Sequence, residues 1–345
     1  MITIDGAQGE GGGQVLRSAL TIALFTGTPL EVINIRAGRH QPGLLRQHLA
    51  CVRAAQAISN GHCEGAALGS QHIRFTPKAV NAGNYQFAIG SAGSTVLVCQ
   101  TILLPLALAN GVSQVQFAGG THNGWSPSLT FFERSFLALL RTMGVQAEVK
   151  LEQLGFHPAG GGRWQLTIKP CQQLQPLKLT EGIAERAARM EYCAIDVIQA
   201  ELPASIVQRE IATTQQQLNW TDAATNVQRV TAACPGNSLH LSVACADYHL
   251  MVEQIGERRL SAETLAKITA TQLQALIKAN VAVDEYLADQ LLLPIAIAGE
   301  GSFTTVQPSL HSQTNIAVIA QMLGKQFSVT EFGDNRWRIA LEADG

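Results

Sequence analysis

The chain has 345 residues, of which 14% are charged, and its formal net charge is −2 at pH 7. A balance so close to neutral argues against a protein that coats nucleic acid non-specifically, since such binding relies on broad neutralisation of phosphates. The longest apolar stretches, 96–109 and 291–298, are too short to cross a bilayer, so we expect no membrane partner.

The cysteines and the first residues indicate a compartment. Seven cysteines, an odd number without a C-x-x-C pair, are typical of reduced thiols in a cytosol. The stretch from Met1 to Asp5 is strand-like and lacks the basic and apolar regions of a secretory signal. We therefore expect a cytoplasmic protein, and nothing in the sequence identifies a protein partner.

A glycine-rich turn, 6–13, follows this first strand and precedes an apolar helix that ends at Gly27. Its glycines let the backbone approach a ligand closely, although their spacing matches neither the P-loop nor the dinucleotide fingerprint. Glu10 is the only carboxylate in the turn. Because Mg²⁺ and Mn²⁺ usually take one or two carboxylates together with substrate phosphates, Glu10 is a candidate metal ligand. A solvated turn glutamate is the alternative.

Positive charge gathers between Gly11 and Cys63, where five arginines face a single acidic residue, Glu31. A run from Arg36 to His48 crosses from the second predicted strand into a helix. Guanidinium groups bind phosphate through two parallel hydrogen bonds, and neighbouring glycines at a helix start favour that role. We therefore expect a phosphate pocket, with a solvated basic face as the alternative. The five arginines are Arg17, Arg36, Arg39, Arg46 and Arg53.

A layout of helix, strand, helix and hairpin recurs three times, and we expect an α/β fold of the α+β kind. Three β-α-β-α-β-β repeats would form its large domain. The first helices end at Gly27, Asn110-Gly111 and Gly299, and strands follow at 30–35, 113–117 and 302–306. The second helices end at Gly61, Gly144 and Gly324, and hairpins follow at 145–151 with 163–168 and at 327–330 with 336–341.

The third repeat is interrupted. Gly144 lies 83 residues after Gly61, but Gly324 lies 180 residues after Gly144, so the third repeat holds about 97 additional residues. Residues 1–181 and 281–345 are therefore expected to form the large catalytic domain, and 182–280 a smaller inserted α+β domain. The insert is either a lid or spacer or a substrate-binding module. Its expected elements are strand 193–198, helix 204–218, strands 239–244 and 249–254, and a helix capped by Ser261.

Three polar residues occupy equivalent positions in the first helices. Arg17 lies ten residues before Gly27, Asp289 ten before Gly299, and Gln100 ten before Asn110. Polar groups on apolar helices require partners. Each could satisfy a loop backbone separately, but three equivalent positions favour one shared polar centre.

Two further residues stand out. Trp125, in the tract from Thr121 to Pro127, is either a base-stacking platform or a packing residue. His311 follows the strand 303–306 and the Pro308 turn, and it precedes a helix expected to begin near Ser312 or Thr314. The positive end of a helix attracts phosphate and lowers the pKa of a nearby imidazole, which favours a neutral nucleophile. A capping or core histidine is the alternative.

The whole chain resembles the RNA 3′-terminal phosphate cyclase family in six motifs that occur in the right order. They are DGAQGEGGGQVLRSAL, RAGRHQPGLLRQH, AIGSAGST, GFHPAGGG, EYLADQ and PSLHSQTN. The resemblance implies a catalytic protein that uses ATP to convert an RNA 3′-phosphate end into a 2′,3′-cyclic phosphate. It also implies three β-α-β-α-β-β repeats and a smaller inserted domain.

The resemblance assigns residue roles. His311 would attack the ATP α-phosphate, form a histidine–AMP adduct and pass AMP to the RNA 3′-phosphate, after which the 2′-hydroxyl closes the ring and displaces AMP. The expected ATP site comprises Gln100, Pro127, Tyr286, Leu287, Ala288, Asp289 and Gln290, with adenine between Tyr286 and Pro127. Phosphates would contact Arg17, Arg36, Arg39, Arg46 and Gln47, and a divalent Mg or Mn ion would bind Glu10.

Two other functions remain as alternatives. One is the non-catalytic branch of the same family, a ribosome-assembly scaffold that lacks the nucleophilic histidine. The other is an enolpyruvyl transferase, since these enzymes also combine such repeats with arginine-rich sites but need neither His311 nor an adenine sandwich. His311 beside EYLADQ favours the cyclase.

Overall fold

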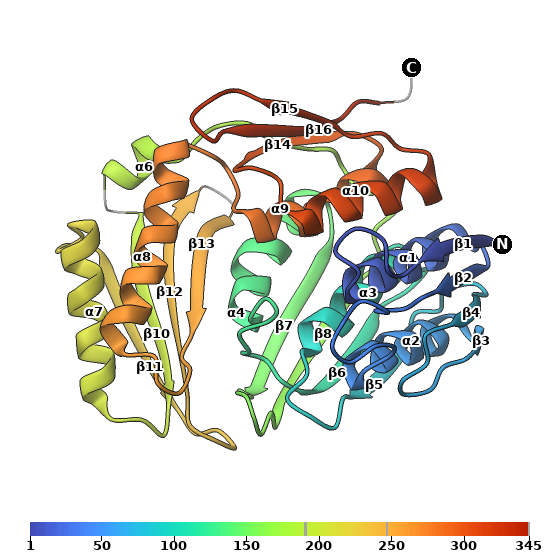
Figure 1. Ribbon diagram of the computed structural model, residues 1–345, viewed down its shortest axis with the longest axis horizontal. Helices are drawn as coiled ribbons and strands as arrows, with labels where there is room; N and C mark the ends of the chain where they lie inside the picture. The colour runs from blue at the N-terminus through green and yellow to red at the C-terminus, as the bar shows by residue number, and fades with distance from the viewer. Residues whose placement is uncertain (190–191, 246–247, 344–345) are drawn as a thin grey trace.

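The computed structural model describes residues 1–189, 192–245 and 248–343 (Figure 1). Its strands form four mixed four-stranded sheets, and helices pack against them. This arrangement confirms the expected α+β class. No helix within these described ranges is both long and apolar enough to cross a membrane.

The first repeat sets the pattern. Its strands pair in the order β1-β2-β4-β3, with β1 parallel to β2 and with β4 antiparallel to both of its neighbours. The elements are β1 (Ile2–Asp5), α1 (Gly13–Thr26), β2 (Leu30–Ile33), α2 (Arg46–Ser59), β3 (His62–Glu64) and β4 (Ile73–Thr76).

The second repeat has the same pairing, in the order β5-β6-β8-β7. Its second helix begins as α4 (Leu129–Phe131), widens into the π-helical turn η1 (Phe132–Phe136) and continues as α5 (Leu137–Thr142). The remaining elements are β5 (Asn84–Ala88), α3 (Thr95–Ala107), β6 (Ser113–Gly119), β7 (Gln146–Gln153) and β8 (Gly162–Lys169).

The third repeat repeats the order as β9-β14-β16-β15. Three sheets with one strand order show that the sequence periodicity describes a real structural repeat. The elements are β9 (Leu177–Leu179), α9 (Glu285–Ala298), β14 (Gly301–Thr305), α10 (Leu310–Leu323), β15 (Ser328–Glu331) and β16 (Trp337–Leu341).

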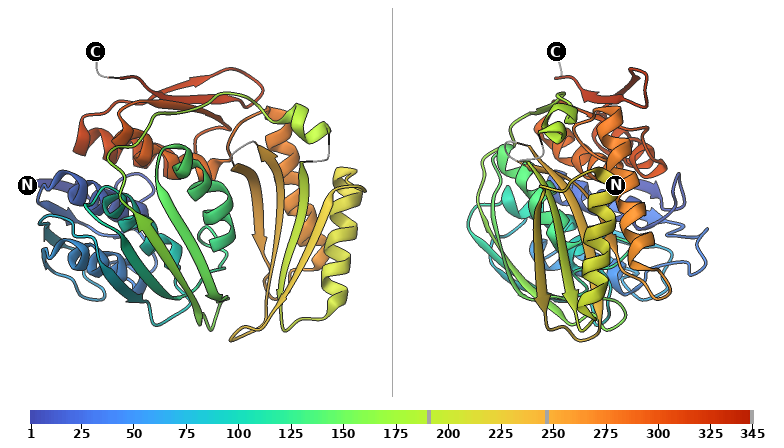
Figure 2. Two further views of the ribbon diagram at one scale, coloured as in Figure 1. Left: turned by 180° about the vertical axis from the view of Figure 1, so that it is seen from behind. Right: turned by 90° about the vertical axis from the view of Figure 1, so that its left-hand side faces the viewer.

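The segment between β9 and α9 builds the fourth sheet, in the order β11-β10-β12-β13. Figure 2 shows it from behind, standing beside β7 and β8. Two of its elements were not expected, α6 (Ala184–Ala188) and the exposed edge strand β11 (Ala224–Val230), whose polar residues give no apolar alternation. The others are β10 (Cys193–Ala200), α7 (Ala204–Leu218), β12 (Gly236–Cys245), β13 (Tyr248–Ile255) and α8 (Ala262–Ala279). The boundaries 182–280 remain a prediction.

The helices of different repeats share one core. Helix α1 packs against α2, α3 and α10, and α10 also packs against α9. In Figure 1 the third sheet lies above α9 and α10 and the first sheet lies at the right, so the helices face inward. Because α3 and α9 are apolar over most of their surfaces, they stabilise the interior by burial on several sides.

Two helix limits differ from the expectation. Helix α3 ends at Ala107 with Leu108 as its C-cap, before the Asn110-Gly111 pair. Helix α10 begins at Leu310, because the Ser309 side chain caps it by accepting a hydrogen bond from the amide of Ser312. His311 therefore lies inside the first turn of α10 and does not precede the helix.

Candidate active site at converging helix N-termini

His311 occupies the positive end of α10. Its side chain is 52% exposed, although the neighbouring Ser312 is fully buried. The first amides of a helix have no partner within the helix, so this turn favours negatively charged groups. An exposed imidazole at such a point is accessible to a phosphate.

The glycine-rich turn lies directly on α10. The amide of Glu10 donates to Thr314 Oγ1 at 2.9 Å. Gly9 has a φ of +57°, and a β-carbon there would overlap the Thr314 hydroxyl. Only glycine meets both requirements, because other residues rarely adopt this φ. The close approach brings Glu10 Oε2 to 3.8 Å from His311 Nδ1.

Glu10 joins the turn to the basic run. Its Oε2 accepts a hydrogen bond from the amide of Gly12 at 2.8 Å, at the N-terminus of α1. Its Oε1 forms an ion pair with Arg39, whose Nη2 also donates to the Glu10 carbonyl at 2.8 Å. The structure therefore brings His311, Glu10 and Arg39 together where α1 and α10 both begin.

The three equivalent polar residues do meet. Arg17, Gln100 and Asp289 line one small pocket between α1, α3, α9 and α10. Gln100 Nε2 donates to Gln290 Oε1 at 2.6 Å, and Asn315 Nδ2 donates to Asp289 Oδ1 at 3.2 Å. The expected shared polar centre is thus present, and α10 contributes Asn315, which the sequence pattern did not single out.

Burial controls the charges of this centre. It raises the pKa of Asp289 to about 6, against the opposing effects of His311 and Arg17. It also lowers the pKa of His311, while Arg17 and Arg39 lower it further and Asp289 raises it. The imidazole of His311 is therefore mainly neutral near pH 7, as a nucleophile requires.

His48, at the start of α2, is a buried neighbour of Arg17. Burial lowers its pKa to about 3, with smaller contributions from Arg17 and Arg36. Its Nδ1 accepts a hydrogen bond from the amide of Leu45 at 3.2 Å. A β-carbon on Gly13 would overlap the His48 and Arg17 side chains. The first turns of α1 and α2 therefore lie in direct contact.

The remaining predicted phosphate ligands already have protein partners. Arg36 Nη1 donates to the carbonyls of Gln41 at 2.6 Å and Gly43 at 2.9 Å, and it thereby stabilises the loop 36–43. Arg46 Nη1 donates to the Gly90 carbonyl at 2.9 Å. Gln47 Oε1 accepts from the amide of Ser94, the N-cap of α3, at 3.2 Å. Their phosphate roles remain predictions.

The expected adenine site lies along α9 and the 121–128 loop. Tyr286 is 59% exposed, whereas the side chains of Leu287 and Ala288 are buried and face the core. Pro127 directly precedes Ser128, the N-cap of α4. The adenine sandwich between Tyr286 and Pro127 remains a prediction.

Glu253, on β13, was missed by the sequence analysis. Its Oε1 accepts from the amide of Ser128 at 2.8 Å, and its Oε2 accepts from the Ser128 hydroxyl. Burial opposes its charge, but His240 and Ser128 outweigh burial and lower the pKa of Glu253. The available signal was a carboxylate in a mostly apolar strand, YHLMVEQI. Glu253 fixes the loop that carries Pro127.

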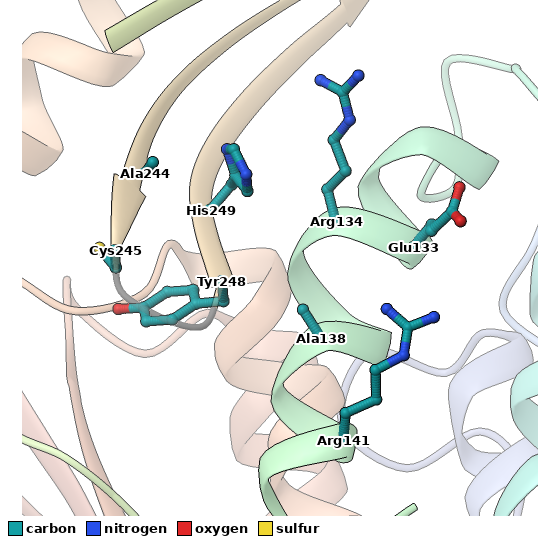
Figure 3. Close-up of a pocket in the computed structure, with 8 residues that line it drawn as sticks. All are labelled: Glu133, Arg134, Ala138, Arg141, Ala244, Cys245, Tyr248 and His249. Atoms are coloured by element: carbon teal, nitrogen blue, oxygen red, sulfur yellow. The ribbon is translucent and has the colours of Figure 1, made fainter. Parts of the chain in front are cut away.

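A larger pocket lies elsewhere, between the η1–α5 helix and the β12–β13 hairpin (Figure 3). Arg134 at its edge forms an ion pair with Asp196 at 2.9 Å, and Ser135 donates to the His249 carbonyl at 2.7 Å. It contains none of the predicted site residues. The two contacts beside it join the fourth sheet to the second repeat.

The fold and the site define a protein of three β-α-β-α-β-β repeats with a neutral histidine at an anion-attracting helix N-terminus. The sequence pattern of the RNA 3′-terminal phosphate cyclase family matches residues 8–329. An RNA 3′-terminal phosphate cyclase of Salmonella typhimurium (strain LT2) is 43% identical over 336 residues, which cover 96% of this chain and 97% of that protein. One of Ectopseudomonas mendocina (strain ymp) is 41% identical over 341 residues, covering 99% and 98%.

The chain belongs to the RNA 3′-terminal phosphate cyclase family. This membership confirms the resemblance and the expected enzyme class.

Gly9→Ala tests the contact between the glycine-rich turn and α10. The added methyl group meets Thr314 and occupies a left-handed backbone conformation, so we expect a loss of about 1–3 kcal/mol in the free energy of unfolding and slower reaction with ATP. Denaturant unfolding measures the first effect.

Gly38→Ala is the matched control, because Gly38 is in the basic run and a β-carbon there meets nothing within 4 Å. It should leave both properties unchanged. Equal behaviour of the two variants would contradict the proposed role of the Gly9–Thr314 contact.

Proposed function

We propose that this enzyme cyclises RNA 3′-terminal phosphates through a covalent adduct between His311 and AMP. The observation that carries the proposal is the position of His311, half exposed in the first turn of α10, within 3.8 Å of Glu10 and beside the Arg17 and Asp289 centre. Family membership supports the overall cyclase reaction and the use of ATP.

In the first step a ring nitrogen of neutral His311 attacks the α-phosphorus of ATP. A phosphorus–nitrogen bond forms, the α–β phosphoanhydride bond breaks, and pyrophosphate leaves. Since Nδ1 faces Glu10, we assign the attack to Nε2. The first amides of α10 and the Arg39 guanidinium stabilise the negative charge that develops on the phosphate oxygens.

In the second step an oxygen of the RNA 3′-phosphate attacks the AMP phosphorus and releases His311. In the third step the adjacent 2′-hydroxyl attacks the 3′-phosphorus, loses its proton and displaces AMP as the ring closes. Covalent catalysis suits this sequence, because AMP is a good leaving group whereas an unactivated phosphate monoester offers only a poor one.

For the nucleotide, we propose that Tyr286 and Pro127 enclose adenine and that Gln100, Asp289 and Gln290 contact the nucleoside. The exposure of Tyr286 and the anchoring of Ser128 by Glu253 support this assignment. Leu287 and Ala288 contribute backbone only, since their side chains are buried. Arg17 and Arg39 are the phosphate ligands that lie beside His311.

A divalent Mg or Mn ion fits Glu10 as a single protein ligand. Within the described ranges no cluster of three or more His, Cys, Asp or Glu residues is arranged to hold a metal. Binding through one carboxylate and substrate phosphates needs no such cluster. A bound ion would supply positive charge to the departing pyrophosphate. Glu10 would then exchange its contact with Arg39 for the ion.

The two alternatives are less well supported. A ribosome-assembly scaffold has no use for an exposed neutral histidine at an anion-attracting helix end. An enolpyruvyl transferase does not account for a family match over residues 8–329. Incubation with α-labelled ATP separates the three functions, because only the cyclase should acquire a covalent, acid-labile label.

His311→Asn tests the nucleophile. We expect it to abolish both the covalent label from α-labelled ATP and cyclisation, while leaving thermal unfolding unchanged, because the ring is half exposed. His62→Asn changes an exposed histidine on β3 and should label normally. Normal labelling of the His311 variant would disprove the covalent mechanism.

The pH dependence tests the neutral state of His311. Protonated imidazole cannot attack, so the rate of enzyme–AMP formation should fall as pH drops through the lowered pKa of His311, below its ordinary 6.5. Asp289→Asn removes the carboxylate that raises this pKa, so the acid limb should move to lower pH. Single-turnover rates at saturating ATP give both profiles.

Asp222→Asn, at an exposed position in the segment between β9 and α9, is the control and should not move the limb. An unmoved limb in Asp289→Asn would mean that this carboxylate does not act on His311.

Glu10 is tested on two half-reactions. Pyrophosphate is the more highly charged leaving group, so Glu10→Ala should slow enzyme–AMP formation about tenfold or more, and ring closure of pre-adenylated RNA less. Rates with and without Mg²⁺ or Mn²⁺ measure the difference.

Glu10→Gln is the matched control, because an amide oxygen still accepts the Gly12 hydrogen bond but lacks charge. It should share the selective loss. Normal rates for Glu10→Gln, together with equal losses in both half-reactions for Glu10→Ala, would show that Glu10 only organises the turn.

A further inference from the structure

Trp125 is the most exposed large apolar side chain within the described ranges, with 92% of its surface accessible. Trp164 and Trp220, in contrast, are 1% and 3% exposed. An indole in water is unfavourable, since aromatic side chains gain much of their stabilisation from burial. The packing interpretation of Trp125 is therefore wrong, and its exposure needs another explanation.

The loop around Trp125 is held firmly. Asn123 is only 9% exposed, and its Oδ1 accepts hydrogen bonds from the Trp125 amide at 3.3 Å and from the Ser126 hydroxyl at 2.6 Å. Its Nδ2 donates to the Ala92 carbonyl at 3.2 Å. Farther along, Ser128 is fixed by Glu253. The indole is thus displayed on a turn that both flanks anchor, which reduces the entropy lost when a ligand stacks on it.

The anchor also connects Trp125 to the active site. Ala92 belongs to the 90–94 turn, whose Gly90 carbonyl accepts from Arg46 and whose Ser94 amide donates to Gln47. The same turn therefore contacts Asn123 on one side and the N-terminus of α2 on the other. Residues 90–94 therefore link the loop that carries Trp125 to two of the predicted phosphate ligands, Arg46 and Gln47.

We propose that Trp125 is a stacking platform for a base of the RNA strand, a few nucleotides from the reacting 3′-phosphate. The inference rests on the proposed function, which requires the enzyme to hold a single-stranded RNA end. Proteins bind such ends by stacking unpaired bases on aromatic side chains, and every base offers a flat face. The single indole stands among Asn123, Gly124 and Ser126, so it lacks the broad apolar patch of a protein interface.

The kinetic test compares Trp125→Ala with Trp125→Phe. The alanine variant should raise the KM for a 3′-phosphorylated RNA oligonucleotide about five- to a hundredfold, and phenylalanine should restore most of the loss. Both variants should form enzyme–AMP from ATP alone with an unchanged KM for ATP. Phe332→Ala, at another exposed aromatic on the β15–β16 turn, is the control and should leave the KM for RNA unchanged.

RNA oligonucleotides with one abasic site, moved stepwise from the 3′ end, locate the stacked base. One position should raise the KM of the native enzyme for RNA, and that position should have no further effect on the KM of Trp125→Ala. Binding to the native enzyme is also followed without ATP by quenching of tryptophan fluorescence. The quenching should be largely lost in Trp125→Phe, because Trp164 and Trp220 are buried and Trp337 lies on β16 of the third sheet.

Two outcomes overturn the proposal. An increased KM for ATP with an unchanged KM for RNA would mean that Trp125 contacts adenine, and unchanged values for both would mean that no base stacks on it. Failure of the proposed cyclase function would give a different result, because the native enzyme would then acquire no covalent label from ATP. The fluorescence measurement needs no such label, and its loss in Trp125→Phe identifies the signal of Trp125.

Discussion

The site depends on one contact between opposite ends of the chain, in which the Glu10 amide donates to Thr314 Oγ1 across 304 residues. Gly9 permits the approach, since its absent side chain leaves room for the Thr314 hydroxyl. The contact places the beginnings of α1 and α10 side by side. Two neighbouring helix N-termini, with Arg39 paired to Glu10 beside them, attract an anion more strongly than either alone. His311 is then exposed in the first turn of α10, beside Glu10.

Repetition of one structural unit supplies the polar centre beside this contact. Arg17, Gln100 and Asp289 are unfavourable on apolar helices unless they have polar partners, which Gln14, Gln290 and Asn315 supply. The three sheets share one strand order, so equivalent positions on α1, α3 and α9 point to a common interior. Burial there raises the pKa of Asp289 to about 6 and lowers that of His311. Desolvation therefore favours the neutral form of both the Asp289 carboxyl group and the His311 imidazole.

The segment between β9 and α9 takes part in this organisation. Glu253 on β13 fixes Ser128 by two hydrogen bonds, and Arg134 of η1 reaches back to Asp196 on β10. A loop of the second repeat is thereby held between two sheets. Its buried residue Asn123 displays Trp125, and its last residue before α4 is anchored from the fourth sheet. The segment between β9 and α9 therefore fixes the loop that carries Trp125 and Pro127, and its role as a spacer or a substrate-binding module stays a prediction.

Local patterns determined the repeats, most of the helix and strand limits, and the types of residue at the site. Apolar periodicity, Ser261 as a cap and glycines at Gly27, Gly299 and Gly324 act over a few residues, so they can be read from sequence. Strand β11 was missed because an exposed edge strand carries no apolar alternation. The partners of Thr314, Asn315 and Glu253 were decided only by the tertiary structure. Their contacts join segments more than a hundred residues apart or neighbouring helices, and no local pattern records which distant backbone fills the space beside a side chain.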